Sequence, residues 1–246
     1  MILLGQDVIM KELVAFMLLA VRLGAMFAVA PVLSATAVSL PIRIALTMAI
    51  TLAMASSVKV PEIDVLSPIG TLTILREILL GLSIGLVFQL AFAAINMAGE
   101  QMAGAMGLGF AAMVDPQTGS QSPVISQFLS IMMTMIFLVT EGHHVMLRLL
   151  AASYEALPIS TDFNADMFLG IVKAGTLMFS AALLIAAPVV FLIFLTNLII
   201  GFMTRVAPQM NIFSIGFSIT IFMGFAVLLV SMPTIGNGMS GPVSYT

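Results

Sequence analysis

The chain has 246 residues, of which 61% are hydrophobic and only 8% are charged, whereas a soluble domain carries about a quarter charged residues. This composition leaves too little polar surface for a water-soluble globule, so it predicts an integral membrane protein or a subunit buried in a larger apolar assembly. The formal net charge is −3 with scattered Lys and Arg, which excludes nucleic-acid binding by charge, and the absence of cysteine excludes disulfides and thiolate chemistry.

Apolar segments separated by short polar breaks make up the first half of the chain, and we expect helices over residues 13–32, 42–58, 71–99 and 124–140. The second segment is close to the lower limit of about 17 residues for a membrane span. Ser67-Pro68 is expected to open the third helix, because proline is favoured in the first turn. A short amphipathic helix over residues 145–157 follows the fourth segment and ends before a proline.

The second half of the chain is almost free of charge. Residues 167–187 and 189–203 form one apolar run, and Pro188 between them is expected to kink a helix or to mark a turn between two helices. The last apolar segment covers residues 212–232, and we expect the Gly- and Ser-rich tail after Pro233 to be poorly ordered. The sequence therefore predicts an all-α protein with about six apolar helices.

Residues 96–123 differ from the apolar segments on both sides, because this stretch is rich in glycine and methionine. Four glycines argue against one long stable helix, since glycine removes side-chain packing and permits positive φ; they are Gly99, Gly104, Gly107 and Gly109. Methionine is unbranched and adaptable, and Asp115-Pro116 breaks a helix. This combination predicts a deformable loop or gate rather than an enzyme site.

Arg22 interrupts the first apolar segment, and a lone arginine at membrane depth needs a carboxylate, carbonyl oxygens or water as partners. Two interpretations stay open: an ion or proton pathway, or a structural pair at a subunit contact or near an interface. Glu100, in the glycine-rich stretch, is the buried carboxylate that we consider as its partner.

Glu141, His143 and His144 are the side chains that most resemble metal ligands. Adjacent histidines lack the i, i+4 spacing of a zinc-binding helix, and no cysteine or second histidine cluster completes a site. The sequence also contains no Gly-x-Ser-x-Gly turn, no triad and no phosphate-binding glycine loop with a lysine. We therefore predict no metal, no cofactor and no enzymatic activity.

Several short motifs together point to one family. In the central stretch they are Ala98-Gly-Glu100, Met106-Gly-Leu-Gly-Phe110, Val114-Asp-Pro116 and Pro123-Val124. Elsewhere they are Arg22 with Ala30-Pro31-Val32, Gly142-His143, Leu157-Pro158-Ile159, Arg205-Val-Ala-Pro-Gln209, Asn211-Ile-Phe and Ile215-Gly-Phe217. Over almost its whole length the chain resembles the FliR family of flagellar biosynthetic proteins, and it stops earlier than family members do, so we expect a C-terminal helical tail to be missing.

The resemblance implies a subunit of a conical export gate in which FliR joins FliP and FliQ, with FlhB and FlhA as further partners and unfolded flagellar proteins as substrates. It implies membrane-associated helical hairpins, with residues 1–165 similar to FliP and residues 166–246 similar to a FliQ hairpin. It also implies a place in the bacterial inner membrane within the flagellar basal body, in contact with lipid but seated largely above the membrane plane.

In that family, the loop that matches residues 106–122 projects into the central channel and helps to close it. The plug residues implied here are Met106, Leu108, Phe110, Met113 and Val114, and the loop hinges are Gly104, Gly107, Gly109 and Pro116. Two alternatives stay open: the homologous subunit of a virulence injectisome, and a small-solute secondary transporter with its site at broken helices.

Overall fold

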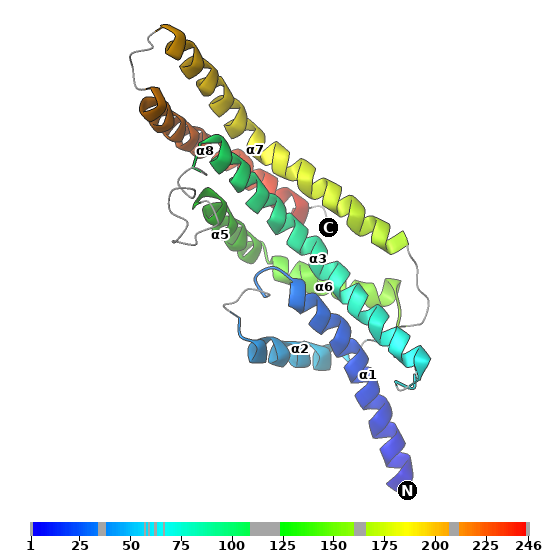
Figure 1. Cartoon of the computed structure of the whole chain (residues 1–246). Helices are drawn as coiled ribbons and strands as arrows, with labels where there is room; N and C mark the ends of the chain where they lie inside the picture. Colours follow the sequence, from blue (N-terminus) through cyan, green and yellow to red (C-terminus); the bar gives the residue numbers. More distant parts are fainter. Residues whose placement is uncertain are drawn as a thin grey trace. The chain divides into compact units, whose positions relative to one another are not determined.

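The computed structural model describes residues 2–33, 38–56, 58, 60–61, 63–65, 67–108, 124–159, 166–206 and 212–244, with side chains except at 2–8, 166–168, 212–215 and 234–244. Within these residues the chain forms α-helices and no strand, so the predicted all-α class is confirmed (Figure 1). The helices are α1 (Ile2–Val29), α2 (Leu40–Met54), α3 (Pro68–Ala105), α5 (Val124–Val139), α6 (Gly142–Ala156), α7 (Asp166–Val206) and α8 (Ile212–Ser244).

Helix boundaries agree with the sequence where local chemistry sets them. The side-chain oxygen of Ser67 accepts a hydrogen bond from the Gly70 backbone N–H at 3.0 Å, and Pro68 occupies the first position of α3, as predicted. Helix α6 ends at Ala156, two residues before Pro158. A residue that precedes proline is biased away from helical geometry, which accounts for this end.

Three expectations about helix interruptions differ from the structure. Helix α3 continues through Gly99 and Gly104 and ends only before Gly107, and α8 continues beyond Pro233 to Ser244 in place of a poorly ordered tail. Helix α7 passes through Pro188 as one helix, so the expected turn between two helices was wrong, whereas a kink at Pro188 stays a prediction. The local cost of glycine or proline in a helix is about 1–3 kcal/mol, which burial of a long apolar face offsets.

Among the residues that the structure describes, four helices are long and apolar enough to cross a membrane, and they contain the segments Ile9–Val29, Pro68–Ala105, Leu169–Val206 and Gly216–Pro233. A fifth is added if the bent pair α5 and α6 counts as one span, whereas α2 is too short. The lengths and composition of these helices agree with the membrane class that the sequence predicts.

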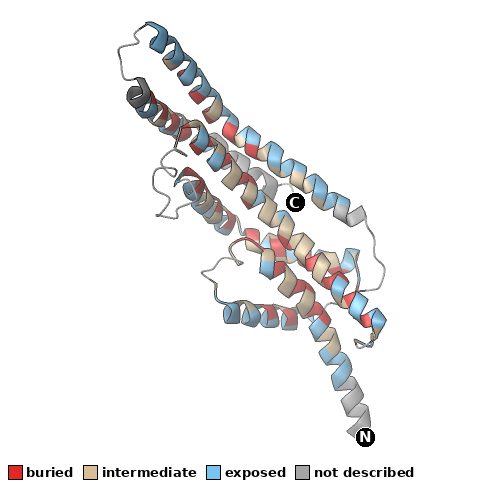
Figure 2. Ribbon diagram, in the orientation of Figure 1, coloured by how far each residue is buried: buried red, intermediate tan, exposed pale blue. Residues whose placement is uncertain are grey.

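One compact unit comprises Met1–Leu90 and His143–Gly175. Within it, α1 packs against α2, and the C-terminal half of α1 consists mainly of buried and intermediate residues, as Figure 2 shows. The buried apolar residues of this core come mainly from α1 and α6; they are Leu18, Leu19, Leu23, Met26, Phe27, Ala30, Met146, Leu150, Tyr154 and Ile159. These contacts bring the start of the chain together with residues more than a hundred positions later.

The other compact unit comprises Ala91–Gly142 and Thr176–Thr246. The rings of Phe92 on α3 and Phe137 on α5 meet edge to face, with centroids 5.7 Å apart. Helix α7 contributes a buried stripe with alternating spacings of four and three residues, at Ala182, Ala186, Val189, Ile193 and Thr196. Neither unit coincides with residues 1–165 or 166–246. The division at residue 165 was based on likeness to FliP and FliQ, and it stays a prediction.

Candidate functional site

Arg22 lies on α1 with no exposed surface, so the prediction that it is buried is confirmed. Its guanidinium forms a two-point contact with the Glu77 carboxylate on α3: Nε donates to Oε2 at 2.6 Å, and Nη2 donates to Oε1 at 3.0 Å. Glu77 is itself fully buried. Two parallel charge-assisted hydrogen bonds fix both the distance and the orientation of the two side chains.

The remaining donors of Arg22 hold the end of α6. Nη1 donates to the Ser153 hydroxyl and Nη2 to the Leu157 carbonyl, both at 3.0 Å. The guanidinium carbon lies 4.1 Å from the centre of the Tyr154 ring, whose hydroxyl donates to the Leu19 carbonyl at 3.0 Å. The arginine therefore connects α1 and α3 with the segment that follows α6.

Arg76 extends this cluster on the other side of Glu77. Its Nη1 lies 3.4 Å from Glu77 Oε1 and donates to the Pro158 carbonyl at 2.7 Å. We call Arg22, Arg76, Glu77, Ser153 and Tyr154 the arginine cluster. Directional bonds occupy its charged groups, and this arrangement favours the structural interpretation of Arg22 over an ion or proton pathway.

Glu100 is exposed at the surface of this chain, and the carboxylate that Arg22 contacts is Glu77, so the expectation of a buried Glu100 as partner of Arg22 was wrong. The partner, Glu77, precedes two glycines at four-residue spacing, Gly81 and Gly85. A Cβ at Gly81 would collide with the Arg22 carbonyl, and one at Gly85 would lie 2.7 Å from the Met26 carbonyl. The Glu-x-x-x-Gly-x-x-x-Gly pattern is the signal that could have identified this face of α3 as the one against α1.

The second candidate region is the C-terminal end of α3, where the predicted plug loop begins. The Gly107 N–H donates to the Gly104 carbonyl and the Leu108 N–H to the Ala103 carbonyl, both at 3.0 Å, and Gly107 has φ of 82°. These two bonds and the left-handed glycine define a Schellman cap. Gly107 therefore ends α3 in a fixed conformation, while the predicted hinge Gly104 lies inside the helix.

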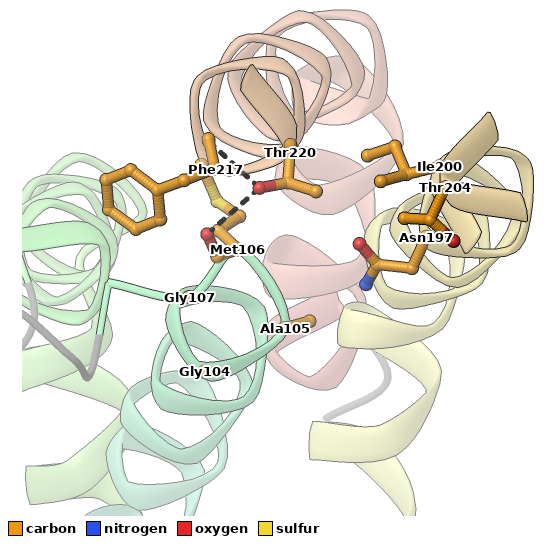
Figure 3. Close-up of a pocket in the computed structure, with 10 residues that line it drawn as sticks. Gly104, Ala105, Met106, Gly107, Asn197, Ile200, Thr204, Phe217 and Thr220 are labelled. Atoms are coloured by element: carbon orange, nitrogen blue, oxygen red, sulfur yellow. Dashed lines mark hydrogen bonds between the residues drawn. The ribbon is translucent and has the colours of Figure 1, made fainter. Parts of the chain in front are cut away.

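Met106 anchors this end of α3 beneath α8. Its side chain is fully buried, and a Cβ built on Gly224 would lie 2.5–2.7 Å from its Cγ, Cε and Sδ. The Thr220 hydroxyl donates to the Phe217 carbonyl at 3.0 Å and approaches the Met106 carbonyl at 3.5 Å. Figure 3 shows Met106, Phe217 and Thr220 together, with both contacts of the threonine drawn as dashed lines.

An open cavity of about 520 Å³ lies beside Met106. In Figure 3, Asn197 and Thr204 on α7 and Thr220 on α8 border it together with the end of α3. Glycine and alanine supply the α3 side, at Gly104, Ala105 and Gly107. Neighbouring space of this size allows the flexible Met106 side chain to repack without unfolding its surroundings.

Helix α5, which follows residues 109–123 in the chain, begins against the same part of α3. A Cβ at Gly99 would lie 2.5 Å from the Ser126 Cα, so the two helices meet at backbone distance. The Ser126 hydroxyl also donates to the Asn96 carbonyl at 3.2 Å. We call the capped end of α3 and the first turn of α5 the stem, because residues 109–123 connect them.

The structure thus describes some of the predicted loop residues. Met106 is buried in the stem, and Gly104, Gly107 and Leu108 lie at its edge. The other predicted plug and hinge residues lie outside the described residues; they are Gly109, Phe110, Met113, Val114 and Pro116. The roles of all of them stay predictions.

The rings of His143 and His144 lie 4.3 Å apart at the start of α6. Across the residues that the structure describes, no group of three or more His, Asp or Glu side chains is placed to hold a metal ion.

Comparison with known proteins gives consistent matches. The model of the family "Bacterial export proteins, family 1" matches residues 13–244. The chain is similar to flagellar biosynthetic protein FliR of Pectobacterium carotovorum subsp. carotovorum, at 38% identity over 87% of this chain and 83% of the relative. It is similar to the same protein of Escherichia coli strain K12, at 35% identity over 87% and 82%, and of Bacillus subtilis strain 168, at 31% identity over 90% and 87%.

Proposed function

The chain belongs to the bacterial export proteins, family 1, as a FliR-type component of the flagellar export apparatus, and from that premise we propose that it is a core subunit of the type III export gate. In this proposal it forms, with FliP and FliQ, the channel through which unfolded flagellar proteins cross the inner membrane. FlhB and FlhA are proposed as neighbours in the flagellar basal body.

The exposed apolar surface of the chain supports the proposal that lipid or partner proteins cover it. Large apolar side chains are exposed on α2, α7 and α8; examples are Leu40, Leu52, Leu184, Phe191, Phe202, Phe222 and Val230. Monomeric soluble proteins rarely leave such continuous apolar faces in water. We propose that lipid covers part of these faces and that partner helices cover the rest, with the assembly seated largely above the membrane plane.

The observation that carries the plug proposal is the stem. Residues 109–123 leave α3 at a capped, buried end and rejoin the chain at α5, which packs against α3 at backbone distance. Both attachment points belong to one compact unit. A segment whose two ends are held at a defined base can occupy a channel reproducibly while its own residues deform, and such a base is what a plug requires.

The residues of this segment fit the task chemically. Phe110 and Met113 are apolar, and glycines and methionines surround them in the sequence. A gate that passes unfolded chains but limits ion leak needs contacts that exclude water and can move aside. Phe110 and Met113 are therefore the proposed plug residues, and no chemical step is assigned to the chain.

The experiment is the double substitution Phe110→Ala with Met113→Ala, in the complex assembled in the native host. We expect a higher ion leak through the purified, reconstituted complex, with unchanged co-purification of partners. Phe202→Ala with Met203→Ala is a matched control, because it removes the same two residue types from an exposed face of α7. An unchanged leak in a fully assembled complex would remove the plug role from Phe110 and Met113.

Co-purification tests the assembly itself. The tagged chain, extracted in mild detergent, should be recovered with FliP-like and FliQ-like proteins in one large particle. Recovery as a small stable species that moves a solute by itself would overturn the proposal in favour of the transporter alternative. Loss of motility on deletion is expected for a flagellar subunit, whereas retained motility with lost virulence secretion would indicate the injectisome.

A further inference from the structure

We infer that α8 is the positioning element of the stem: Gly224 and Thr220 hold Met106, and through it the end of α3. The functional meaning of this inference rests on the proposed plug function. Met106, Thr220 and Gly224 belong to one compact unit, and Thr220 and Gly224 lie outside the sequence motifs.

The first support is the shape of the contact. The Met106 side chain occupies the space that a Cβ at Gly224 would fill, with three of its atoms within 2.7 Å of that position. With Met106 in this position, a Cβ at 224 would require the flexible methionine side chain to move. A side chain that fills a notch in a facing helix is held against sliding along that helix, as in knobs-into-holes packing.

The second support is the pattern along α8. Buried small or polar residues recur at four-residue spacing, at Gly216, Thr220 and Gly224. A Cβ at Gly216 would meet the Ile200 side chain of α7 at 3.3 Å, whereas Thr220 and Gly224 contact Met106. One face of α8 therefore contacts both α7 and the end of α3, at different turns.

The third support is the distribution of hydrogen bonds at the stem. The Schellman cap uses the carbonyls of Ala103 and Gly104, and the Thr220 hydroxyl approaches the carbonyl of Met106. At 3.5 Å this contact is weak. The Gly224 notch therefore sets the position of Met106 by shape, and the Thr220 hydroxyl adds a weak, directional contact to the Met106 carbonyl.

The test uses the absence of cysteine in the chain, which leaves a thiol introduced by Leu108→Cys as the only one in this subunit. Its rate of labelling by a small maleimide in the assembled complex reports the position of the stem. The variants are Gly224→Ala, Met106→Ala and the two combined. Gly216→Ala is the matched control, because it adds the same methyl group to the same stripe of α8 away from Met106.

We expect each single change to alter the labelling rate by about threefold or more, since residues in direct contact couple measurably. Gly224→Ala pushes Met106 out of the notch, and Met106→Ala leaves the notch empty. Combining them fills the notch with the new methyl group and removes the collision. The combined variant should therefore return toward the original rate, while Gly216→Ala leaves it unchanged.

This reversal distinguishes positioning from general destabilisation, which would make the combined variant worse than either single one. Unchanged labelling in the single variants, or no recovery in the combined variant, would overturn the inference. If Gly224→Ala prevents assembly, recovery of assembly on adding Met106→Ala supports the inference, and failure to recover overturns it.

Ion leak, measured on complexes that carry the same variants but keep Leu108, tests the proposed plug function separately, because Leu108 is itself a predicted plug residue. Labelling that changes and recovers as expected, together with an unchanged leak, would support α8 as the positioning element of the stem and count against the plug. A leak that rises in Gly224→Ala and falls again in the combined variant would support both.

Discussion

The arginine cluster and the stem both hold distant segments together, but they use different interactions. Each joins segments that are far apart in the sequence. The arginine cluster uses short, charge-assisted hydrogen bonds around the buried Glu77 carboxylate. The stem uses a methionine in a glycine notch, a glycine cap and one long hydrogen bond from Thr220.

The difference determines how each region responds to change. A buried charge that loses its partner is left uncompensated, so the arginine cluster should fail abruptly. Packing between methionine and small residues changes gradually, because thioether side chains repack and a neighbouring cavity offers space. The first region suits a fixed frame, and the second suits an attachment point for the proposed plug segment.

Removing Glu77 should have the largest effect. Glu77→Ala leaves Arg22 buried without its carboxylate, and we expect a loss of about 3–5 kcal/mol in the free energy of unfolding. The chain has no tryptophan, so unfolding by denaturant in detergent is followed by helical circular dichroism. Glu100→Ala is the matched control and should change stability by no more than about 0.5 kcal/mol, because Glu100 is exposed. Similar losses from both variants would contradict the assigned pairing.

A methyl group at Gly99 should have the next largest effect, because it tests the packed part of the stem. The added Cβ would lie 2.5 Å from the Ser126 Cα and 2.9 Å from the Ser126 N, and backbone cannot rotate aside as a side chain does. We expect Gly99→Ala to lower the free energy of unfolding by about 1–3 kcal/mol. Gly104 lies on the same helix, and a Cβ there would have no heavy atom within 4 Å. Gly104→Ala should therefore stabilise the helix by up to about 1 kcal/mol. Equal effects would mean that the helices do not meet at Gly99.

Gly107→Ala tests the cap. Its φ of 82° is costly for a residue with a Cβ, and we expect a loss of about 1–2 kcal/mol, seen as a lower melting temperature of the purified complex. Gly107→Asn should lose less, because asparagine tolerates the left-handed conformation. If alanine and asparagine behave alike, the backbone at this position is not left-handed.

Tyr154→Phe should have the smallest effect, and it tests a single neutral hydrogen bond within the arginine cluster. It removes the hydroxyl that donates to the Leu19 carbonyl at 3.0 Å and keeps the ring beside Arg22. We expect a loss of about 0.5–1.5 kcal/mol in the free energy of unfolding. Tyr154→Leu removes the ring as well and should cost more, and a smaller cost for leucine would exclude a contribution from the arginine–ring contact.

Several features were predictable because nearby residues determine them. The apolar composition indicated the membrane class, and Ser67-Pro68 indicated the start of α3. Charge in an apolar segment indicated that Arg22 must have buried partners. Pro188 left a kink and a turn between two helices open, and the structure excludes only the turn, because α7 is one helix through this residue.

Partner choice was not predictable in the same way. Glu77 and Glu100 lie on the same helix, yet only Glu77 is buried against Arg22, which is 55 residues away in the chain. Gly99 and Gly224 could be read as flexible positions, but their role here is to let another segment approach closely. Which residues become partners depends on which face of each helix packs against which neighbouring helix.

The sequence by itself determined that the chain is helical, apolar and a member of its family, because composition, periodicity and short motifs carry that information along the chain. Only the tertiary structure decided which carboxylate neutralises Arg22 and which glycine receives Met106. Those pairings arise when helices distant in sequence pack at backbone distance, where one methyl group or one charge decides whether two faces fit.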